Sequence, residues 1–542
     1  MPYTAHLDTF ARDRLPAPAD QPEFLFELPE LQFPGRLNCA AELLDKRIGQ
    51  GWGERRCLIA PDGTTWTYAE LQSRAHRIAN VLVQDMGLVP GNRVLLRAAN
   101  SPMLAACWFA VVMAGGIAVG TMPMLRAREL AQIIDKAQVS HALCDAALAD
   151  ELAQAAAAAP ALREVRHFGT TAECSLEARM ARQSDRFAAV DTAADDICLL
   201  AFTSGTTGQP KATMHGHRDV MAACVCFPRH VLRAGADDVF IGSPPLAFTF
   251  GLGGLLLFPM HVGAATVLLA KASPPDLLDG IARHRATVLF TAPTSYRAMA
   301  EATRQRRLSQ PQGGTLRKCV SAGEALPAAT RTLWREATGI ELIDGIGATE
   351  MLHIFISADE QTARPGATGK AVPGYRACVV DERLNPLPPG QVGRLAVKGP
   401  TGCRYLDDPR QSQYVQGGWN LTGDAYVQDA DGYFFYQSRT DDMIVSAGYN
   451  IAGPEVEDML LRHPDVAECA VIGVPDDERG QVVKAFVVLK PGVAGDAACA
   501  RALQDYVKAN IAPYKYPRAV EFRSGLPRTE TGKLQRFRLR QT

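Results

Sequence analysis

A run of small, hydroxyl-bearing residues, FTSGTTGQPKAT at Phe202–Thr213, has the residue types that phosphate chemistry needs. Its two glycines allow the backbone to curl so that successive N–H groups face one anion. Its hydroxyl groups add hydrogen-bond donors, and Lys211 adds a positive charge. The glycine spacing and the lysine position differ from G-x-x-x-x-G-K-[ST], so this is not that phosphate loop. On its own the segment fits either a phosphate cradle or a glycine-rich turn.

Four further motifs follow in order along the chain. They are DGIGATEM at 344–351, NLTGDAY at 420–426, SRTDDMIVSAGYNIAGPEVE at 438–457 and PRTETGKLQR at 527–536. Together with the first segment they resemble the adenylate-forming superfamily of acyl-CoA synthetases, luciferases and peptide-synthetase adenylation domains. The resemblance runs from about Trp66 to the C-terminus. It favours the phosphate cradle over the turn.

The resemblance implies a site for ATP and Mg²⁺. The hydroxyl-rich loop would hold the β- and γ-phosphates, and Thr349 would bond the α-phosphate. Glu350 would ligate Mg²⁺, a hard cation that prefers oxygen ligands; alone, this residue also fits an acid at a helix start. Asp424 would accept both ribose hydroxyls, with Arg439 beside it. The predicted nucleotide-binding residues are Thr203, Ser204, Gly205, Thr206, Thr207, Gly208, Lys211, Gly323, Glu324, Asp344, Gly345, Ile346, Asp424 and Arg439.

One of these positions departs from the family pattern. The family often has an aromatic residue that stacks on adenine where Ile346 stands. Adenine can be held by aliphatic contacts instead, so we expect a sandwich without ring stacking.

Lys533, in the motif PRTETGKLQR, matches the family's catalytic lysine. The first half-reaction joins a carboxylate to the α-phosphate, so two anions must approach and negative charge concentrates on oxygen. A cation at that point stabilises the transition state. Without the motif, a solvated lysine in a basic tail is the alternative. The resemblance therefore assigns catalysis to Lys533, Thr349 and Glu350.

Coenzyme A is the expected acceptor, because no carrier-protein segment follows Lys533 before Thr542. In the family, a small C-terminal domain rotates about the position matched by Asp441 to present a second active site. Gly448 would then let the pantetheine arm pass closely, since glycine has no Cβ; a simple turn is the alternative for this glycine.

The acid pocket is predicted from PLAFTFGLGG at 245–254 and GIGATEMLHIF at 345–355. These segments look most like the benzoate-CoA and 2-aminobenzoate-CoA ligase branch. Benzoate ligases tend to have alanine and tyrosine where Thr249 and Phe250 stand, and a hydroxyl there suits an ortho amino group. Phe250 and His353 also fit ordinary core positions. The predicted substrate residues are Thr249, Phe250, Gly347 and His353, and the expected acid is 2-aminobenzoate, with benzoate as the alternative.

The elements that position these motifs follow from hydrophobic patterning. Short apolar strands alternate with amphipathic helical segments over the first part of the chain, which is typical of parallel sheets with helices on both faces. The fold class is therefore α/β, with a large N-terminal domain of doubly wound parallel sheets (residues 1–440). It includes a β subdomain at about 366–431. A small mobile α+β C-terminal domain is expected at residues 441–542.

The composition of the chain limits the kinds of partner that we expect it to bind. The chain has 542 residues, 57 Lys plus Arg and 58 Asp plus Glu, a formal net charge of −1. This balance gives no reason to expect nucleic-acid or membrane binding. The uncharged stretch at 103–124 contains two adjacent glycines and indicates a core helix followed by a core strand rather than a membrane span. The 13 cysteines contain no C-x-x-C pair. We expect a cytoplasmic monomer or homodimer.

Two rival functions stay open at this stage. One is an adenylating enzyme that stops at the adenylate or loads a separate carrier protein. The other is a non-catalytic nucleotide- or acyl-binding regulator, against which the presence of Lys533, Glu350 and Asp424 argues, since such a protein needs no such set.

Overall fold

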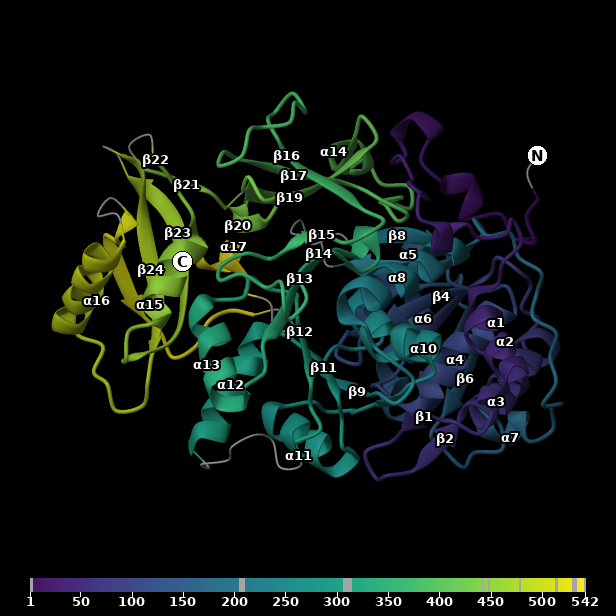
Figure 1. Ribbon diagram of the computed structural model, residues 1–542. Helices are drawn as coiled ribbons and strands as arrows, with labels where there is room; N and C mark the ends of the chain where they lie inside the picture. The colour runs from purple at the N-terminus through teal and green to yellow at the C-terminus, as the bar shows by residue number, and fades with distance from the viewer. Residues whose placement is uncertain are drawn as a thin grey trace.

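The structure is a computed structural model that describes residues 3–203, 210–305, 314–440, 442–446, 449–476, 479–511, 515–528 and 534–540. Two large sheets carry the N-terminal part, an antiparallel sheet follows, and a separate group of strands and helices forms the C-terminal part. In Figure 1 the C-terminal elements β23, β24, α15 and α16 lie beside α12 and α13, and α1 to α4 lie at the opposite end.

The first large sheet has six strands in the order β6-β5-β3-β4-β7-β8. All neighbours are parallel except β7 and β8, which form an antiparallel pair. Its strands are β3 (Arg93–Arg97), β4 (Ile117–Thr121), β5 (His141–Asp145), β6 (Glu164–Phe168), β7 (Ile197–Thr203) and β8 (Lys211–Gly216). The helices of this part are α1 (Cys39–Leu43), α2 (Asp45–Arg47), α3 (Tyr68–Asn80), α4 (Pro102–Met113), α5 (Ala127–Ala137), α6 (Ala149–Ala158), α7 (Leu176–Met180) and α8 (His217–Phe227).

The second large sheet has nine strands in the order β15-β14-β13-β12-β11-β9-β10-β1-β2. Its centre is parallel and its edges are antiparallel. Its strands are β1 (Arg56–Ile59), β2 (Thr65–Thr67), β9 (Val239–Gly242), β10 (Ala265–Val267), β11 (Val288–Thr291), β12 (Lys318–Ser321), β13 (Leu342–Gly347), β14 (Ile354–Ser357) and β15 (Lys370–Ala371). Its helices are α9 (Thr249–Leu252), α10 (Phe258–Val262), α11 (Pro274–His284), α12 (Pro293–Gln305) and α13 (Ala328–Thr338).

Two smaller units complete the fold. The antiparallel sheet contains β16 (Arg376–Val380), β17 (Val392–Lys398), β18 (Val415–Gln416), β19 (Trp419–Gln428) and β20 (Phe434–Arg439), with α14 (Gln411–Tyr414) beside it. The C-terminal part contains β21 (Ile444–Ser446), β22 (Tyr449–Ile451), β23 (Val466–Asp476), β24 (Gly480–Leu489), β25 (Ala519–Phe522), α15 (Gly453–Leu461), α16 (Ala497–Asn510) and α17 (Arg536–Leu539). The predicted fold class is confirmed; the boundary at 440/441 stays a prediction.

The uncharged stretch at 103–124 forms a buried helix, α4, followed by the buried strand β4, as the two glycines between them predict. Every residue of α4 from Leu104 to Met113 is buried. Among the described residues, no helix is long and apolar enough to cross a membrane.

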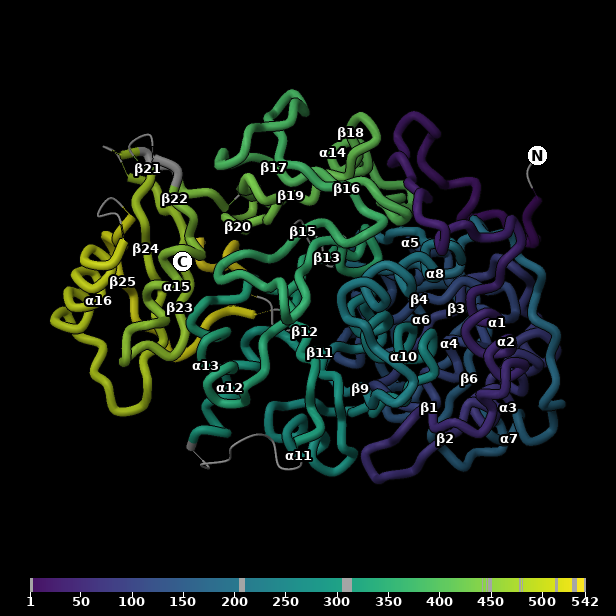
Figure 2. The backbone as a smooth tube through the Cα atoms, viewed as in Figure 1, coloured from purple at the N-terminus to yellow at the C-terminus, as the bar shows by residue number. Residues whose placement is uncertain are grey.

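The sheet order brings the motifs together. The β7–β8 hairpin ends the first sheet at the hydroxyl-rich segment, while the segments after β12 and β13 leave the second sheet at the carboxyl ends of parallel strands. Carboxyl ends of neighbouring parallel strands meet at one edge, where α/β proteins bind ligands. The tube in Figure 2 places β13 and β15 next to the antiparallel sheet that carries β19.

Candidate active site

Lys211, at the start of β8, lies in a buried polar cluster with Glu350 and Tyr405. The Lys211 ammonium is 3.2 Å from a Glu350 carboxylate oxygen and donates to the Tyr405 hydroxyl at 2.8 Å. The Tyr405 hydroxyl donates to the same Glu350 oxygen. The structure thus joins two motifs that the sequence separates by 139 positions.

The charge state of Glu350 follows from this cluster. Burial alone would raise its pKa, but the Lys211 charge and the Tyr405 hydrogen bond outweigh burial and hold the pKa below its usual value. The group is therefore an anionic oxygen donor with 7% of its surface exposed. Such a donor fits Mg²⁺, which prefers oxygen ligands.

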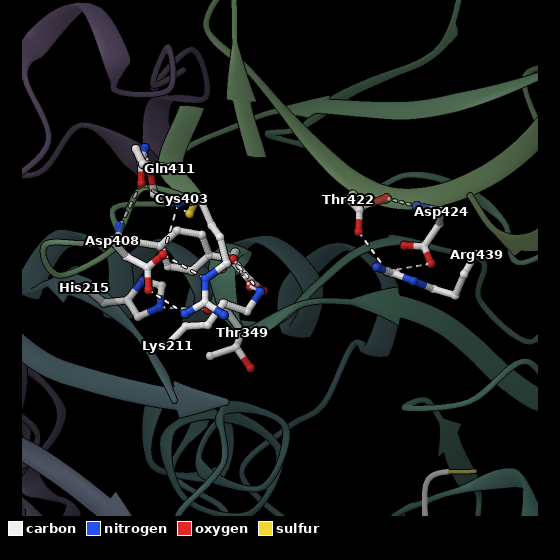
Figure 3. Close-up of polar contacts among 12 residues, drawn as sticks. Lys211, His215, Thr349, Cys403, Asp408, Gln411, Thr422, Asp424 and Arg439 are labelled. Atoms are coloured by element: carbon white, nitrogen blue, oxygen red, sulfur yellow. Dashed lines mark hydrogen bonds and ion pairs between the residues drawn. The ribbon is translucent and has the colours of Figure 1, made fainter. Parts of the chain in front are cut away.

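His215, four residues after Lys211 on β8, fixes the backbone that carries Thr349 and Glu350. Its Nε2 lies 2.8 Å from the Thr349 carbonyl oxygen. Burial lowers the pKa of His215 to about 4, so the ring is neutral and Nε2 is the donor. Figure 3 shows Lys211, His215 and Thr349 side by side below Cys403 and Gln411.

Asp424 and Arg439 lie opposite each other on two neighbouring strands of the antiparallel sheet. They are directly paired in the register of β19 and β20, and the Arg439 guanidinium lies 3.2 Å from the Asp424 carboxylate. Arg439 also donates to the Thr422 carbonyl at 2.9 Å, as Figure 3 shows. The predicted ribose pair is thus brought together.

The predicted adenine-side residues lie at the ends of β12 and β13. Gly323 takes φ +93° just after β12, and Glu324 follows it. Gly345 and Ile346 continue β13, where Ile346 pairs with Ile356 of β14 and packs against the core.

The carboxyl group of Asp344, also on β13, differs from that of Glu350 in the direction of its pKa shift. Burial raises its pKa to about 7, and the more distant Arg331 only partly offsets this.

The C-terminal part reaches this edge of the site through Arg528. Arg528 lies 3.2 Å from Glu324 and 2.9 Å from Glu468 of β23. Asp458 of α15 accepts from the backbone N–H of Ala329, which adds a second contact between the two parts. Arg528 stands five positions before Lys533.

Several predicted residues lie outside the described residues. These are Lys533, Asp441, Gly448 and the loop residues Ser204, Gly205, Thr206, Thr207 and Gly208. Thr203, the last residue of β7 before that loop, has a buried hydroxyl with no partner among the described residues.

The predicted acid pocket is a cluster of rings around His353. The ring centroids of the neighbours lie 4.5 to 6.3 Å from the imidazole, and they come from α8, α9, α10 and β11. These neighbours are Phe227, Phe250, Phe258 and Phe290. Thr249 begins α9 and is buried next to Phe250, and Gly347 is exposed at the end of β13.

The imidazole of His353 is neutral, and of its two nitrogens only Nε2 has a hydrogen-bond partner among the described residues. Burial lowers its pKa to about 3. Its Nε2 lies 3.3 Å from the Phe250 carbonyl oxygen, so this nitrogen carries the proton. Its Nδ1 is then an acceptor, and it is buried with no partner among the described residues. A buried acceptor without a donor costs about 1–3 kcal/mol.

Two glycines explain how the rings pack so closely. A Cβ at Gly253 would lie 2.4 Å from His353 Cδ2, and one at Gly254 would lie 2.5 Å from Phe290 Cδ1. Only glycine lets the helix backbone approach the two rings to this distance.

Comparison with known proteins identifies the family. The family model "AMP-binding enzyme" matches residues 45–404, and "AMP-binding enzyme C-terminal domain" matches residues 455–533. The chain belongs to the AMP-binding enzyme family. The predicted resemblance is confirmed.

Relatives of this AMP-binding enzyme include aryl- and acyl-CoA ligases. A benzoate–CoA ligase of Thauera aromatica is 34% identical over 518 residues, 94% of this chain and 97% of that protein. The mitochondrial acyl-coenzyme A synthetase ACSM5 of Mus musculus is also 34% identical, over 88% and 84% of the two chains. The solved anthranilate CoA ligase AuaEII with anthranoyl-AMP has a TM-score of 0.89 at 35% identity, covering 95% and 98%.

Sequence reasoning missed several residues of this AMP-binding enzyme. Tyr405 follows directly on the stretch matched by the first family model, in a segment without an obvious motif. His215 stands within MHGH, a signal that points to chemistry only once Thr349 is known to be its neighbour. Phe227, Phe258 and Phe290 are ordinary apolar residues in sequence, and only the packing places them around His353.

Proposed function

We propose that this AMP-forming aryl/acyl-CoA ligase activates small benzoates, with 2-aminobenzoate preferred, to the acyl-adenylate and then to the coenzyme A thioester. The observation that carries the proposal is the ring cluster around His353, in which Nδ1 is buried with no hydrogen-bond partner in the described part of the chain. Identity alone does not decide the acid, because the benzoate ligase and the mouse acyl synthetase share the same 34% identity with this chain.

The first half-reaction forms one bond and breaks another at the α-phosphorus of ATP. An oxygen of the carboxylate attacks, pyrophosphate leaves, and the acyl-adenylate results. Lys211 and the loop before it hold the phosphates, Thr349 lies at the α-phosphate, and Asp424 with Arg439 holds the ribose. Glu350 would hold Mg²⁺, which neutralises phosphate charge when bound. Lys533 supplies a cation to the charge that develops on oxygen.

The second half-reaction needs the thiol of coenzyme A. The thiol sulfur attacks the acyl carbon of the adenylate, its proton is lost to solvent, and AMP leaves. Rotation about Asp441 is proposed to bring Gly448 to the pantetheine arm. Since Lys533 serves only the first step, Lys533→Ala is expected to spare thioester formation from supplied acyl-adenylate.

The ring cluster favours a flat acid. Four phenylalanine rings within 6.3 Å of His353 give faces and edges that a benzoate ring can pack against. A long acyl chain instead needs an open apolar tunnel. An ortho amino group would donate to His353 Nδ1 and so satisfy the acceptor, whereas benzoate would leave it unpaired.

The test is pyrophosphate release with 2-aminobenzoate, 2-hydroxybenzoate, benzoate, 4-aminobenzoate and octanoate, with and without free coenzyme A. We expect 2-aminobenzoate first, 4-aminobenzoate no better than benzoate, and thioester formed with free coenzyme A. Octanoate activated faster than every benzoate would refute the aromatic pocket. Adenylate without thioester would favour the enzyme that loads a separate carrier protein.

His353→Gln is the decisive variant, because glutamine can still donate to the Phe250 carbonyl, while its acceptor is the amide oxygen at the tip of the side chain and not an atom at the position of Nδ1. We expect the preference for 2-aminobenzoate over benzoate in kcat/KM to fall by about tenfold or more. Thr249→Ala tests the other predicted partner of the amino group. Phe258→Leu is the packing control and should weaken all benzoates alike. If His353→Gln leaves the preference unchanged and benzoate is the better substrate, the enzyme is a benzoate ligase.

A further inference from the structure

Tyr405 lies on a short segment that adds to the edge of β8. The N–H of Met214 donates to the Arg404 carbonyl at 2.8 Å, and the N–H of Leu406 donates to the Ala212 carbonyl at 2.9 Å. These bonds set Tyr405 opposite Thr213, two residues from Lys211. Gln411 accepts from the Tyr405 N–H at 2.8 Å, which ties the segment to α14. The backbone at Tyr405 is therefore held without help from its hydroxyl group.

The side chain of Tyr405 points from this segment into the cluster with Lys211 and Glu350. It is 1% exposed, and its ring centroid lies 5.0 Å from the Lys211 ammonium. Its hydroxyl contacts both charged groups, at 2.8 Å from Lys211 and in a short hydrogen bond to Glu350. A single hydroxyl thus bridges the cation of the phosphate loop and the candidate metal ligand.

The direction of these hydrogen bonds is fixed by chemistry. An ammonium can only donate and an ionised carboxylate can only accept. A phenol has an ordinary pKa of about 10, so at neutral pH it carries a proton that it can donate. The phenol oxygen therefore accepts from Lys211 and its O–H donates to Glu350. Bonds to charged groups are the stronger class of hydrogen bond.

We infer that Tyr405 is a positioning residue for the adenylation step. Its hydroxyl group orients Glu350 and Lys211 for nucleotide binding. This inference rests on the proposed function. Lys211 also contacts Glu350 directly, and that contact must loosen when phosphate takes the ammonium. The bond from Tyr405 can persist, and it then keeps the carboxylate oriented while Lys211 turns to the phosphates.

The chain offers a matched control in Tyr414 of α14. Its ring lies 5.9 Å from that of Tyr405 in an edge-to-face contact. Its hydroxyl is also buried but has no hydrogen-bond partner among the described residues. Removing this hydroxyl deletes the same atom from the same neighbourhood without breaking a described bond to Glu350 or Lys211.

The experiment compares Tyr405→Phe with Tyr414→Phe in the full chain. Calorimetry measures the Kd of ATP with Mg²⁺ in the absence of acid. Steady-state kinetics separate the KM of ATP from that of the acid, and supplied acyl-adenylate isolates the thioester step. We expect Tyr405→Phe to raise the Kd and KM of ATP about tenfold, the size of one lost bond to a charged group. The KM of the acid and the thioester step should stay unchanged, and Tyr414→Phe should match wild type.

A double-mutant cycle with Lys211→Met separates positioning from folding. If Tyr405 acts through Lys211 and Glu350, its effect should shrink in the Lys211→Met background, because contacting residues are not additive. ATP affinity of Tyr405→Phe equal to wild type would overturn the inference, as would equal losses in both half-reactions or full additivity. A wild-type enzyme that binds ATP but activates no benzoate would refute the proposed function alone.

Discussion

The phosphate cluster of Lys211, Glu350 and Tyr405 and the ring cluster around His353 are both buried, yet they are built in opposite ways. In the first, each charge has a partner and the hydroxyl of Tyr405 bonds to both. In the second, the only titratable group is neutral and one of its nitrogens lacks a described partner. A site that must serve every reaction of a family needs fixed charges. A site that distinguishes one acid from another can leave a polar atom to be completed by its substrate.

Glu350→Gln should produce the largest effect. It tests whether the phosphate cluster contributes equally to the activation of every acid. Loss of one preorganised charge typically costs about 10²–10³ in rate. We therefore expect adenylate formation, measured as pyrophosphate release, to fall by that factor for 2-aminobenzoate, benzoate and every other accepted acid alike. The thioester step from supplied acyl-adenylate should be spared.

Glu360→Gln is the control for this change, because Glu360 forms a carboxylate–ammonium pair with Lys318 at 2.6 Å outside the candidate site. It should leave activity unchanged. A loss in Glu350→Gln that differs tenfold between acids would mean that the two clusters are not separate in function.

The contrast between paired and unpaired groups extends to two carboxyl groups near the same sheet edge. Glu350 has a cation at 3.2 Å and a pKa below its usual value. Burial raises the pKa of Asp344 to about 7, and the Arg331 charge offsets this only in part. A carboxyl group whose pKa is higher in the folded than in the unfolded chain binds more protons when folded, so its contribution to stability is lost as pH rises from about 4 to 7.

Asp344→Asn tests that contrast through the pH dependence of the free energy of unfolding. Each pH unit well inside the window costs about 1.4 kcal/mol and the slope halves near pH 7, so the wild type should lose about 2 kcal/mol from this group between pH 5 and pH 7. The asparagine variant has no charge to bury and should escape the loss. Urea unfolding at pH 5, 6, 7 and 8 gives the difference between the two chains, which should grow up to pH 7 and then level off. A difference that is constant with pH would contradict the raised pKa.

The residues proposed for the phosphate side could be picked out of the sequence far more readily than those proposed for the acid side. Lys211, Thr349, Glu350, Asp424 and Arg439 belong to short motifs in which charged or hydroxyl residues stand among glycines, and such patterns have few structural explanations. The structure joins Lys211 to Glu350 and Asp424 to Arg439. The alternation of strands and helices likewise predicted the parallel sheets, because hydrophobic periodicity is a local property.

The acid side could not be predicted in the same detail, because it depends on long-range packing. Phe227, Phe258 and Phe290 come from a helix end, a helix start and a strand, and none of them stands in a motif. Tyr405 was missed for a similar reason: its partners lie 194 and 55 positions away in the sequence. Residues whose role arises only from tertiary contacts leave no pattern in a single sequence.

Gly253→Ala should have the smallest effect and tests whether the position of His353 determines acid preference. The new Cβ would lie 2.4 Å from His353 Cδ2 and 2.9 Å from its Nε2, so the ring must shift. The backbone of Gly253 has φ −63°, which alanine adopts without strain. We expect kcat/KM for 2-aminobenzoate to fall about tenfold, because overpacking of this kind typically costs about 1–3 kcal/mol.

The selectivity of the loss is what makes Gly253→Ala informative. A displaced imidazole weakens its bond to the Phe250 carbonyl and moves Nδ1, so 2-aminobenzoate should lose more than benzoate. The KM of ATP should not change, because among the described residues the hydrogen bond and ring contacts of the His353 side chain go to phenylalanines and not to the phosphate cluster. Gly35→Ala is the control, since a Cβ there meets nothing within 4 Å. An equal loss for both acids would show that the ring cluster only shapes the pocket, and a higher KM for ATP would show that the two clusters are mechanically coupled.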